Sequence, residues 1–183
     1  MGLSKLFNTL TVLFLLLTGI CAVLSYNSSL GIFLTLAITF GTFAYHLTIR
    51  LFVAFLVNFA HHEFDARSRW FEVGKRETAL YNKLGVKCWK SKLPTYMPES
   101  FNPKVNSWQV ILQEMCKSEV VHELNVVLSF LPIFAGRWFG AYPVFIITSV
   151  LAATFDLLFV IIQRYNRPRV ISLLERQKGR NDS

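Results

Sequence analysis

Four long apolar stretches constrain the fold of this chain more than any other feature of its sequence. They cover about residues 6–24, 30–57, 120–135 and 144–162 of the 183 residues, of which 53% are hydrophobic. A helix of about 20 residues crosses a hydrocarbon layer roughly 30 Å thick, so three of the stretches are long enough to span it. The third has 16 residues, which is marginal for a span even with local thinning of the bilayer, and the distribution of basic residues described below favours four spans. The sequence therefore predicts an all-α integral membrane protein with four transmembrane helices, formed by a single membrane domain over residues 1–183.

The first stretch has a competing interpretation, because a cleaved signal peptide also begins with a basic residue and an apolar run. Lys5 precedes the run, but no small-x-small cleavage site follows it. We therefore expect a retained transmembrane helix.

The distribution of basic residues predicts the topology. Of the 19 Lys and Arg residues, 17 are Lys5, ten residues within 63–118, and six residues from Arg164 onward. With four spans, all of these lie on one side of the membrane, which the positive-inside rule makes cytoplasmic. A re-entrant third stretch would separate the tail from the loop. We therefore expect a multi-pass protein of the cell membrane with both termini in the cytoplasm, a cytoplasmic loop over residues 63–118 and a basic tail over residues 164–183.

The loop is expected to carry short interfacial helices. Residues 76–84 form an amphipathic pattern that Gly85 would end, and residues 87–92 alternate basic with bulky side chains. Pro94, Pro98 and Pro103 predict irregular backbone, and a helical pattern returns at Trp108. Residues 136–143 are expected to form a turn before the fourth span.

The net charge of +8 lies beside the membrane segments, so an anionic leaflet or a phosphorylated substrate is a better partner than nucleic acid. The densest basic segment is residues 163–169, with Arg164, Arg167 and Arg169, which we call the basic collar. Guanidinium groups hold phosphate oxygens, but arginines at this place also act as topological anchors. No cysteine or histidine spacing typical of a metal site is found, and no glycine-rich phosphate loop occurs.

Glu119 and His122 are three residues apart, so they share one face of a helix. A histidine beside a carboxylate is the usual means of taking a proton from a hydroxyl group, but a helix-start histidine near a surface glutamate has the same spacing. In the second stretch, His46, Arg50 and Asn58 also share a face, and ionisable groups at such depth usually face a bundle interior.

Three motifs of this chain resemble the glycosyl-4,4'-diaponeurosporenoate acyltransferase family, small bacterial membrane enzymes of staphyloxanthin-type carotenoid biosynthesis. The resemblance covers about residues 70–175. Its motifs are Val86-Lys87-Cys88-Trp89-Lys90 with Leu93-Pro94, Glu119-Val120-Val121-His122 with Leu131-Pro132, and Ile162-Gln163-Arg164-Tyr165-Asn166-Arg167-Pro168-Arg169.

The resemblance implies the transfer of a fatty acyl group from an acyl-CoA or acyl carrier to a sugar hydroxyl of a glycosylated carotenoid acid, with no cofactor. On this hypothesis His122 is the general base, and Glu119 orients it. The substrate-binding residues are expected to be Arg164, Asn166, Arg167, Arg169, Lys87, Trp89, Lys90 and Arg50. Two alternatives remain: an acyltransferase that acts on another membrane glycolipid or polyprenyl lipid, and a non-enzymatic membrane adaptor with a basic surface.

Overall fold

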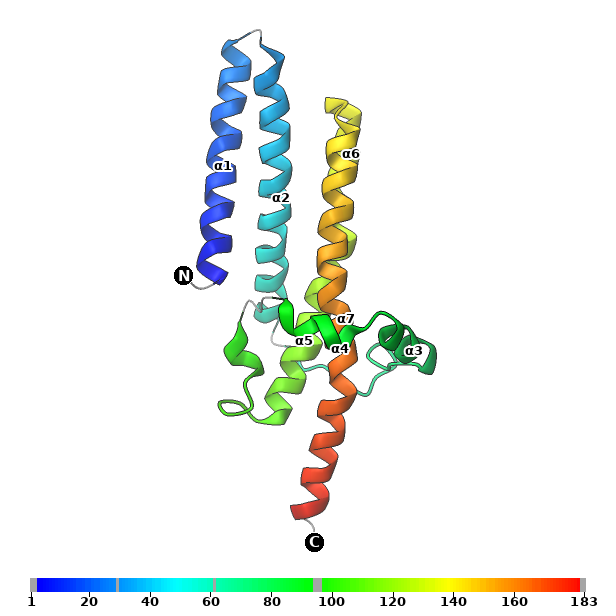
Figure 1. The fold of residues 1–183 in the computed structure, drawn as a ribbon. Coiled ribbons are helices and arrows are strands. Elements are labelled where there is room, and N and C mark those ends of the chain that lie inside the picture. Colours follow the sequence, from blue (N-terminus) through cyan, green and yellow to red (C-terminus); the bar gives the residue numbers. More distant parts are fainter. Residues whose placement is uncertain (1–2, 29, 61, 94–96, 182–183) are drawn as a thin grey trace. The chain divides into compact units, whose positions relative to one another are not determined.

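The computed structural model of the chain describes residues 3–28, 30–60, 62–93 and 97–181, and its regular secondary structure there is entirely helical (Figure 1). The long helices are α1 (Leu3–Asn27), α2 (Gly31–Phe59), α5 (Trp108–Leu128) and α7 (Tyr142–Asn181). The short ones are α3 (Lys75–Lys83), α4 (Val86–Trp89) and α6 (Pro132–Phe139), with two 3-10 turns, η1 (Lys90–Lys92) and η2 (Pro98–Phe101). The all-α prediction is confirmed. Pro94, expected in irregular backbone, lies outside the described residues.

Four segments are long and apolar enough to cross a membrane: Ser4–Asn27, Gly31–Phe59, Trp108–Phe139 and Tyr142–Arg180. The four predicted transmembrane helices are therefore confirmed, and the chain is a multi-pass membrane protein. Every segment is longer than its predicted span, because apolarity marks only the part that suits hydrocarbon, whereas backbone hydrogen bonds continue the helix into polar sequence. The third segment differs most, since it consists of α5 followed by α6. Pro132 begins α6, where its missing N–H is no loss.

One local prediction is wrong. Residues 136–143 were expected to form a turn, but α6 continues to Phe139. Gly140, with φ of 66°, ends the helix in the left-handed conformation and donates its N–H to the Gly136 carbonyl at 2.8 Å. The basic tail is not a separate segment. It continues the helix of the fourth span, because α7 runs unbroken to Asn181 with Pro168 inside it.

The chain forms two compact units. Unit 1 comprises Met1–Leu56 and Leu124–Asp156, and unit 2 comprises Val57–Glu123 and Leu157–Ser183. In unit 1, α1 and α2 lie side by side in opposite directions (Figure 1). Gly41 permits their close approach, since an added Cβ would lie 3.3 Å from Thr18 Cγ2, and Phe14 stacks on Phe43 with ring centroids 5.4 Å apart. Small residues at such contacts are typical of helices that pack within lipid.

Unit 2 builds its apolar core from parts of the chain that are far apart in sequence. One buried cluster consists of Ala66, Phe71 and Cys116, and a second of Ile111, Met115 and Val170. Gly85, with φ of 61°, separates α3 from α4 and confirms the predicted end of the amphipathic helix. The two clusters pack residues 64–71, α5 and α7 against one another, and this packing positions the basic collar.

Candidate functional site

Glu119, on α5, carries a buried carboxylate that two arginines of the collar hold. Arg164 Nη1 donates to its Oε1 at 2.8 Å, and Arg167 donates to both carboxylate oxygens. The exposed fraction is 0% for Glu119 and 1% for Arg167. Arg167 also donates to the Phe71 carbonyl at 2.6 Å and lies over the Phe71 ring. Charges at this depth persist only when they are paired and hydrogen-bonded, so Arg167 serves the packing of unit 2.

Arg164 joins α7 to the segment that precedes α3. Its Nε donates to Glu77 Oε1 at 2.5 Å, and its Nη atoms donate to the carbonyls of Trp70 and Glu72 at 3.0 and 2.9 Å. Burial disfavours the ionised form of Glu77, but hydrogen bonds from Arg164 and Tyr81 outweigh burial and lower the pKa of Glu77. Burial, together with the bond to Glu77, raises the pKa of Tyr81. The charge of Arg164 is thus neutralised within the protein.

The other part of the collar is cationic. Lys90 Nζ donates to Asn166 Oδ1 at 2.5 Å and lies 4.9 Å from the centroid of the Tyr165 ring. The Arg169 guanidinium lies 4.3 Å from the same centroid and donates to the Tyr165 hydroxyl at 2.8 Å. We call these four residues the Tyr165 cluster. Among the described residues, no ion pair joins Lys90 or Arg169 to a carboxylate.

The electrostatics of the Tyr165 cluster favour an anion. Partial burial, and next the charge of Arg169, lower the pKa of Lys90. Lys90 and Arg169 both lie close to the Tyr165 ring without a carboxylate partner among the described residues, so their charges repel each other, and a bound anion would relieve this repulsion. Arg169 is exposed, whereas Lys90, Tyr165 and Asn166 are half-buried, so the cluster is open to a ligand.

His122 lies one turn after Glu119 on α5 and is half-buried. Its ring stacks on Phe159, with centroids 4.8 Å apart and planes 13° from parallel. The predicted partner, Glu119, is engaged by Arg164 and Arg167, which the sequence did not indicate. The next acid on this helix, Glu123, accepts a hydrogen bond from Trp70 Nε1 at 2.9 Å.

The remaining predicted residues lie as follows. Lys87 is exposed on α4, and Trp89 Nε1 donates to the Leu84 carbonyl at 3.1 Å. Arg50 belongs to unit 1, where it pairs with Asp156 at 2.5 Å and donates to the Ala152 carbonyl at 3.0 Å. All predicted site residues except Arg50 are therefore in unit 2.

Sequence reasoning missed Glu77, which is separated by 87 residues from Arg164. An acidic residue in the first turn of an amphipathic helix has an ordinary local reason to be there, since it complements the helix dipole. Only the packing of the preceding segment onto α7 brings it to the collar.

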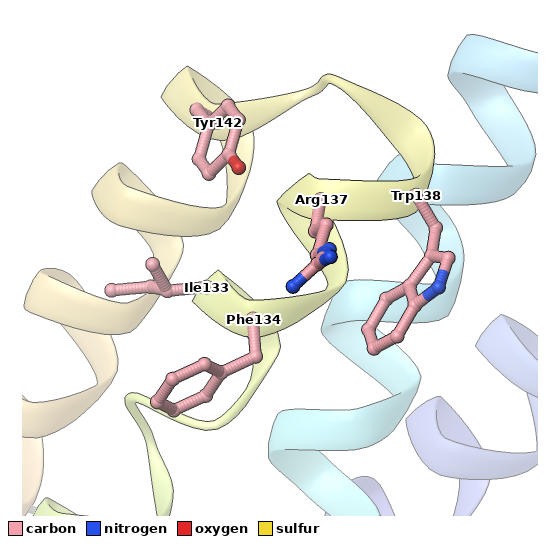
Figure 2. Close-up of a pocket in the computed structure, with 5 residues that line it drawn as sticks. All are labelled: Ile133, Phe134, Arg137, Trp138 and Tyr142. Atoms are coloured by element: carbon pink, nitrogen blue, oxygen red, sulfur yellow. The ribbon is translucent and has the colours of Figure 1, made fainter.

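Unit 1 has an open pocket of about 600 Å³ between α6 and the start of α7, shown in Figure 2. It is lined by Ile133, Phe134, Arg137, Trp138 and Tyr142. Arg137 extends between the rings of Phe134 and Trp138 (Figure 2). The combination of aromatic rings and one cation is typical of the edge of a membrane, and none of the predicted site residues is part of this lining.

Comparison with known proteins identifies a family. The family model of glycosyl-4,4'-diaponeurosporenoate acyltransferases matches residues 65–176, a segment that contains the Tyr165 cluster, His122 and the buried group around Glu119. Neither the curated proteins nor the solved structures gave a match. Because the matched segment is more than half of the chain, this protein belongs to the glycosyl-4,4'-diaponeurosporenoate acyltransferase family.

Proposed function

We propose that this protein transfers a fatty acyl group from an acyl-CoA or an acyl carrier to a sugar hydroxyl of a glycosylated carotenoid acid, without a cofactor. The observation that carries the proposal is the family match over residues 65–176. It is supported by the presence, in the same segment, of a cationic cluster and of a histidine that lies on a helix of one of the four segments long and apolar enough to cross a membrane. This combination suits a reaction between a membrane-embedded acceptor and a water-soluble donor.

The Tyr165 cluster is proposed to bind the donor phosphates. Lys90 and Arg169 have charges that no carboxylate among the described residues neutralises, and exposed Lys87 is near in sequence on α4. Trp89, beside Lys90, offers an apolar face to the donor. Arg164 and Arg167 have a positioning role, because their donors are directed to Glu77 and Glu119. On this proposal only Arg169 of the three collar arginines binds phosphate, whereas the sequence suggested that all three do.

Asn166 is proposed to bind the sugar or the oxyanion. An ammonium group only donates hydrogen bonds, so the oxygen of the Asn166 amide must face Lys90. The amide NH₂ group is then available as a donor, which is the polarity that a developing oxyanion requires.

His122 is proposed to act as the general base. It takes the proton of the sugar hydroxyl while the hydroxyl oxygen attacks the thioester carbonyl, and a carbon–oxygen bond forms. The carbon–sulfur bond then breaks, and the proton passes from His122 to the leaving thiolate. The stack on Phe159 holds the imidazole plane, with ring centroids 4.8 Å apart. Glu119 is proposed to act on His122 through the position of α5 rather than as a proton acceptor.

The experiment compares His122→Ala with the wild type in a host that makes the glycosylated carotenoid acid, with mass spectrometry of extracted lipids as the measurement. We expect the acylated carotenoid to disappear while the protein remains in the membrane. His62→Ala is the matched control, because His62 is exposed, contacts the Phe64 ring edge-on with centroids 4.9 Å apart and has no proposed role. An active His122→Ala enzyme would contradict the assignment of the general base. Acylation of another glycolipid by the wild type would show that the acceptor is that lipid and not the glycosylated carotenoid acid.

A second comparison separates the donor site from an adaptor surface. Lys90→Met and Arg169→Met should raise the KM for the donor by about tenfold or more each, because a lost charge-assisted contact is worth roughly 1.5–3 kcal/mol. Lys104→Met, an exposed charge elsewhere in the loop, is the control. If all three variants behave alike, the basic surface acts only through its total charge.

A further inference from the structure

Among the described residues of unit 1, five buried side-chain polar atoms lack a hydrogen-bond partner within the protein. They are Nδ1 and Nε2 of His46, Oδ1 of Asn125, Oγ of Ser129 and Oγ of Ser149. The exposed fraction of each residue is 5% or less, and all lie in or at the end of helices α2, α5 and α7. Polar groups inside a membrane protein are expensive unless they are bonded, so these atoms require an explanation.

The two serines differ from the threonines of the same unit. Thr11, Thr18, Thr42 and Thr148 each donate to the carbonyl four residues earlier, at 2.7 to 2.9 Å. This local bond is the usual way for a hydroxyl to be satisfied within a transmembrane helix. Ser129 and Ser149 do not make it, so their hydroxyl groups remain for another partner.

Three of the four residues lie within about one turn of one another along the helix axes, and Asn125 precedes Ser129 by four residues, or about one turn. The Tyr45 hydroxyl donates to the Leu128 carbonyl at 2.8 Å, which places the next residue, His46, near the level of the end of α5 and of Ser129. Arg50 donates to the Ala152 carbonyl at 3.0 Å, and α2 and α7 run in the same direction (Figure 1). The same guanidinium donates to the His46 carbonyl, so Ala152 lies near the level of His46. Ser149 precedes Ala152 by three residues, or about 4.5 Å along the axis, so His46 and Ser149 lie within about one turn of each other.

The chemistry of these groups selects an uncharged partner that both donates and accepts hydrogen bonds. Serine hydroxyls do both, the amide oxygen of Asn125 accepts, and a neutral imidazole has one donor and one acceptor. The neighbouring cation, Arg50, is already paired with Asp156 at 2.5 Å, so the group has no excess charge to attract an ion. A hydroxyl group fits this set, whereas a phosphate or a metal ion does not.

We propose that His46, Asn125, Ser129 and Ser149 form an intramembrane site that binds hydroxyl groups, supplied by water or by the sugar of a membrane-bound acceptor. Buried water typically makes two to four hydrogen bonds to groups of this kind. Binding of water is independent of the proposed acyl transfer, whereas binding of the sugar depends on it.

The first measurement is the thermal unfolding of the purified full-length protein carrying Ser149→Ala or Ser129→Ala, with and without the glycosylated carotenoid acid. If the hydroxyl is bonded to water or sugar, its removal lowers Tm by a few degrees, because a hydrogen bond is lost. If the hydroxyl is buried dry and unpaired, its removal raises Tm. The sign of the shift therefore reports on the site without any need for activity.

The second measurement is thiol reactivity in intact membranes. Ser149→Cys and Ser129→Cys are placed in a Cys88→Ser background, where Cys21 and Cys116 are buried, and are treated with a small cationic methanethiosulfonate. Ile147→Cys and Val127→Cys are matched controls on the same helices, with exposed fractions of 59% and 69%, and apolar residues exposed on such helices are expected to face lipid. Because the thiolate is the reactive form and hydrocarbon suppresses it, we expect the site cysteines to react about tenfold faster than the controls or more.

A lower Tm together with fast thiol reaction supports the proposal. Reaction that the glycosylated carotenoid acid does not slow assigns the site to water, and reaction that it slows assigns the site to the sugar. A raised or unchanged Tm, or site cysteines as inert as the lipid-facing controls, overturns the proposal. Transfer activity is measured separately by lipid mass spectrometry, so a failure of this site is distinguishable from a failure of the proposed function.

Discussion

Replacement of Glu119 by Gln tests whether its carboxylate holds unit 2 together. Gln keeps the volume of the side chain and one acceptor oxygen, but removes the negative charge that faces Arg164 and Arg167. Arg164 retains the carboxylate of Glu77, whereas Arg167, with 1% of its surface exposed, loses its charged partner and retains neutral acceptors such as the Phe71 carbonyl. Removal of one member of a buried ion pair costs about 3–5 kcal/mol.

The retained acceptor oxygen places the expected loss at the lower end, about 3 kcal/mol, which is more than a hundredfold in the unfolding equilibrium. For a chain of this size the corresponding fall in Tm is roughly 6–12 °C. The assay is thermal unfolding in detergent micelles. Transfer activity should fall in parallel with the folded fraction, because the role assigned to Glu119 is structural.

The control is Glu123→Gln, a neighbouring acid on the same helix. Glu123 accepts from Trp70 Nε1 at 2.9 Å, and Trp70 is 65% exposed, so its loss should change stability by less than about 1 kcal/mol. The double variant Glu119→Gln with Arg167→Met should recover part of the loss, since an apolar partner leaves no unpaired charge. If Glu119→Gln is as stable as Glu123→Gln but inactive, the carboxylate acts in catalysis and the structural reasoning is refuted.

Three further predictions concern other contacts. In Gly136→Ala the added Cβ would lie 2.5 Å from the Tyr142 ring, so we expect a loss of about 1–3 kcal/mol by thermal unfolding; Gly19→Ala, with nothing within 4 Å, should not lower Tm. Asp156→Asn leaves the Arg50 charge without its carboxylate partner and should cost about 3–5 kcal/mol, a loss that Asp156→Glu should partly avoid. The stabilisation from Glu77 should be complete above pH 4.5, its ordinary pKa, and disappear as the pH falls through the lower pKa of the folded state. A pH series of Tm for wild type and Glu77→Gln checks this, and equal acid sensitivity of the two would contradict it.

The ends of the helices could be predicted from the sequence only in part. The four spans and the end of α3 at Gly85 follow from local composition, and the structure agrees with them. The turn expected over residues 136–143 is wrong, because Gly136 is a packing residue under Tyr142 and only Gly140 has the left-handed conformation. A glycine in sequence does not reveal whether it is needed for its backbone angle or for its small size.

The collar shows the limit of reasoning from residue type. Arg164, Arg167 and Arg169 look alike as a charge cluster, yet two are engaged by Glu77 and Glu119 and the third lies over Tyr165. A phosphate-binding arginine and a structural one have the same sequence signal, because the difference lies in the partners.

By itself the sequence determined that the chain is helical, that it has four segments long and apolar enough to cross a membrane and that it resembles one family of acyltransferases, since the length of apolar runs and the order of motif residues are local properties. Only the tertiary structure decided which arginines are neutralised, that Lys90 meets Asn166, and that Arg50 pairs with Asp156. Those contacts join residues 76 and 106 positions apart. They depend on which helix faces pack together, and that packing is a property of the whole set of buried surfaces rather than of any one segment.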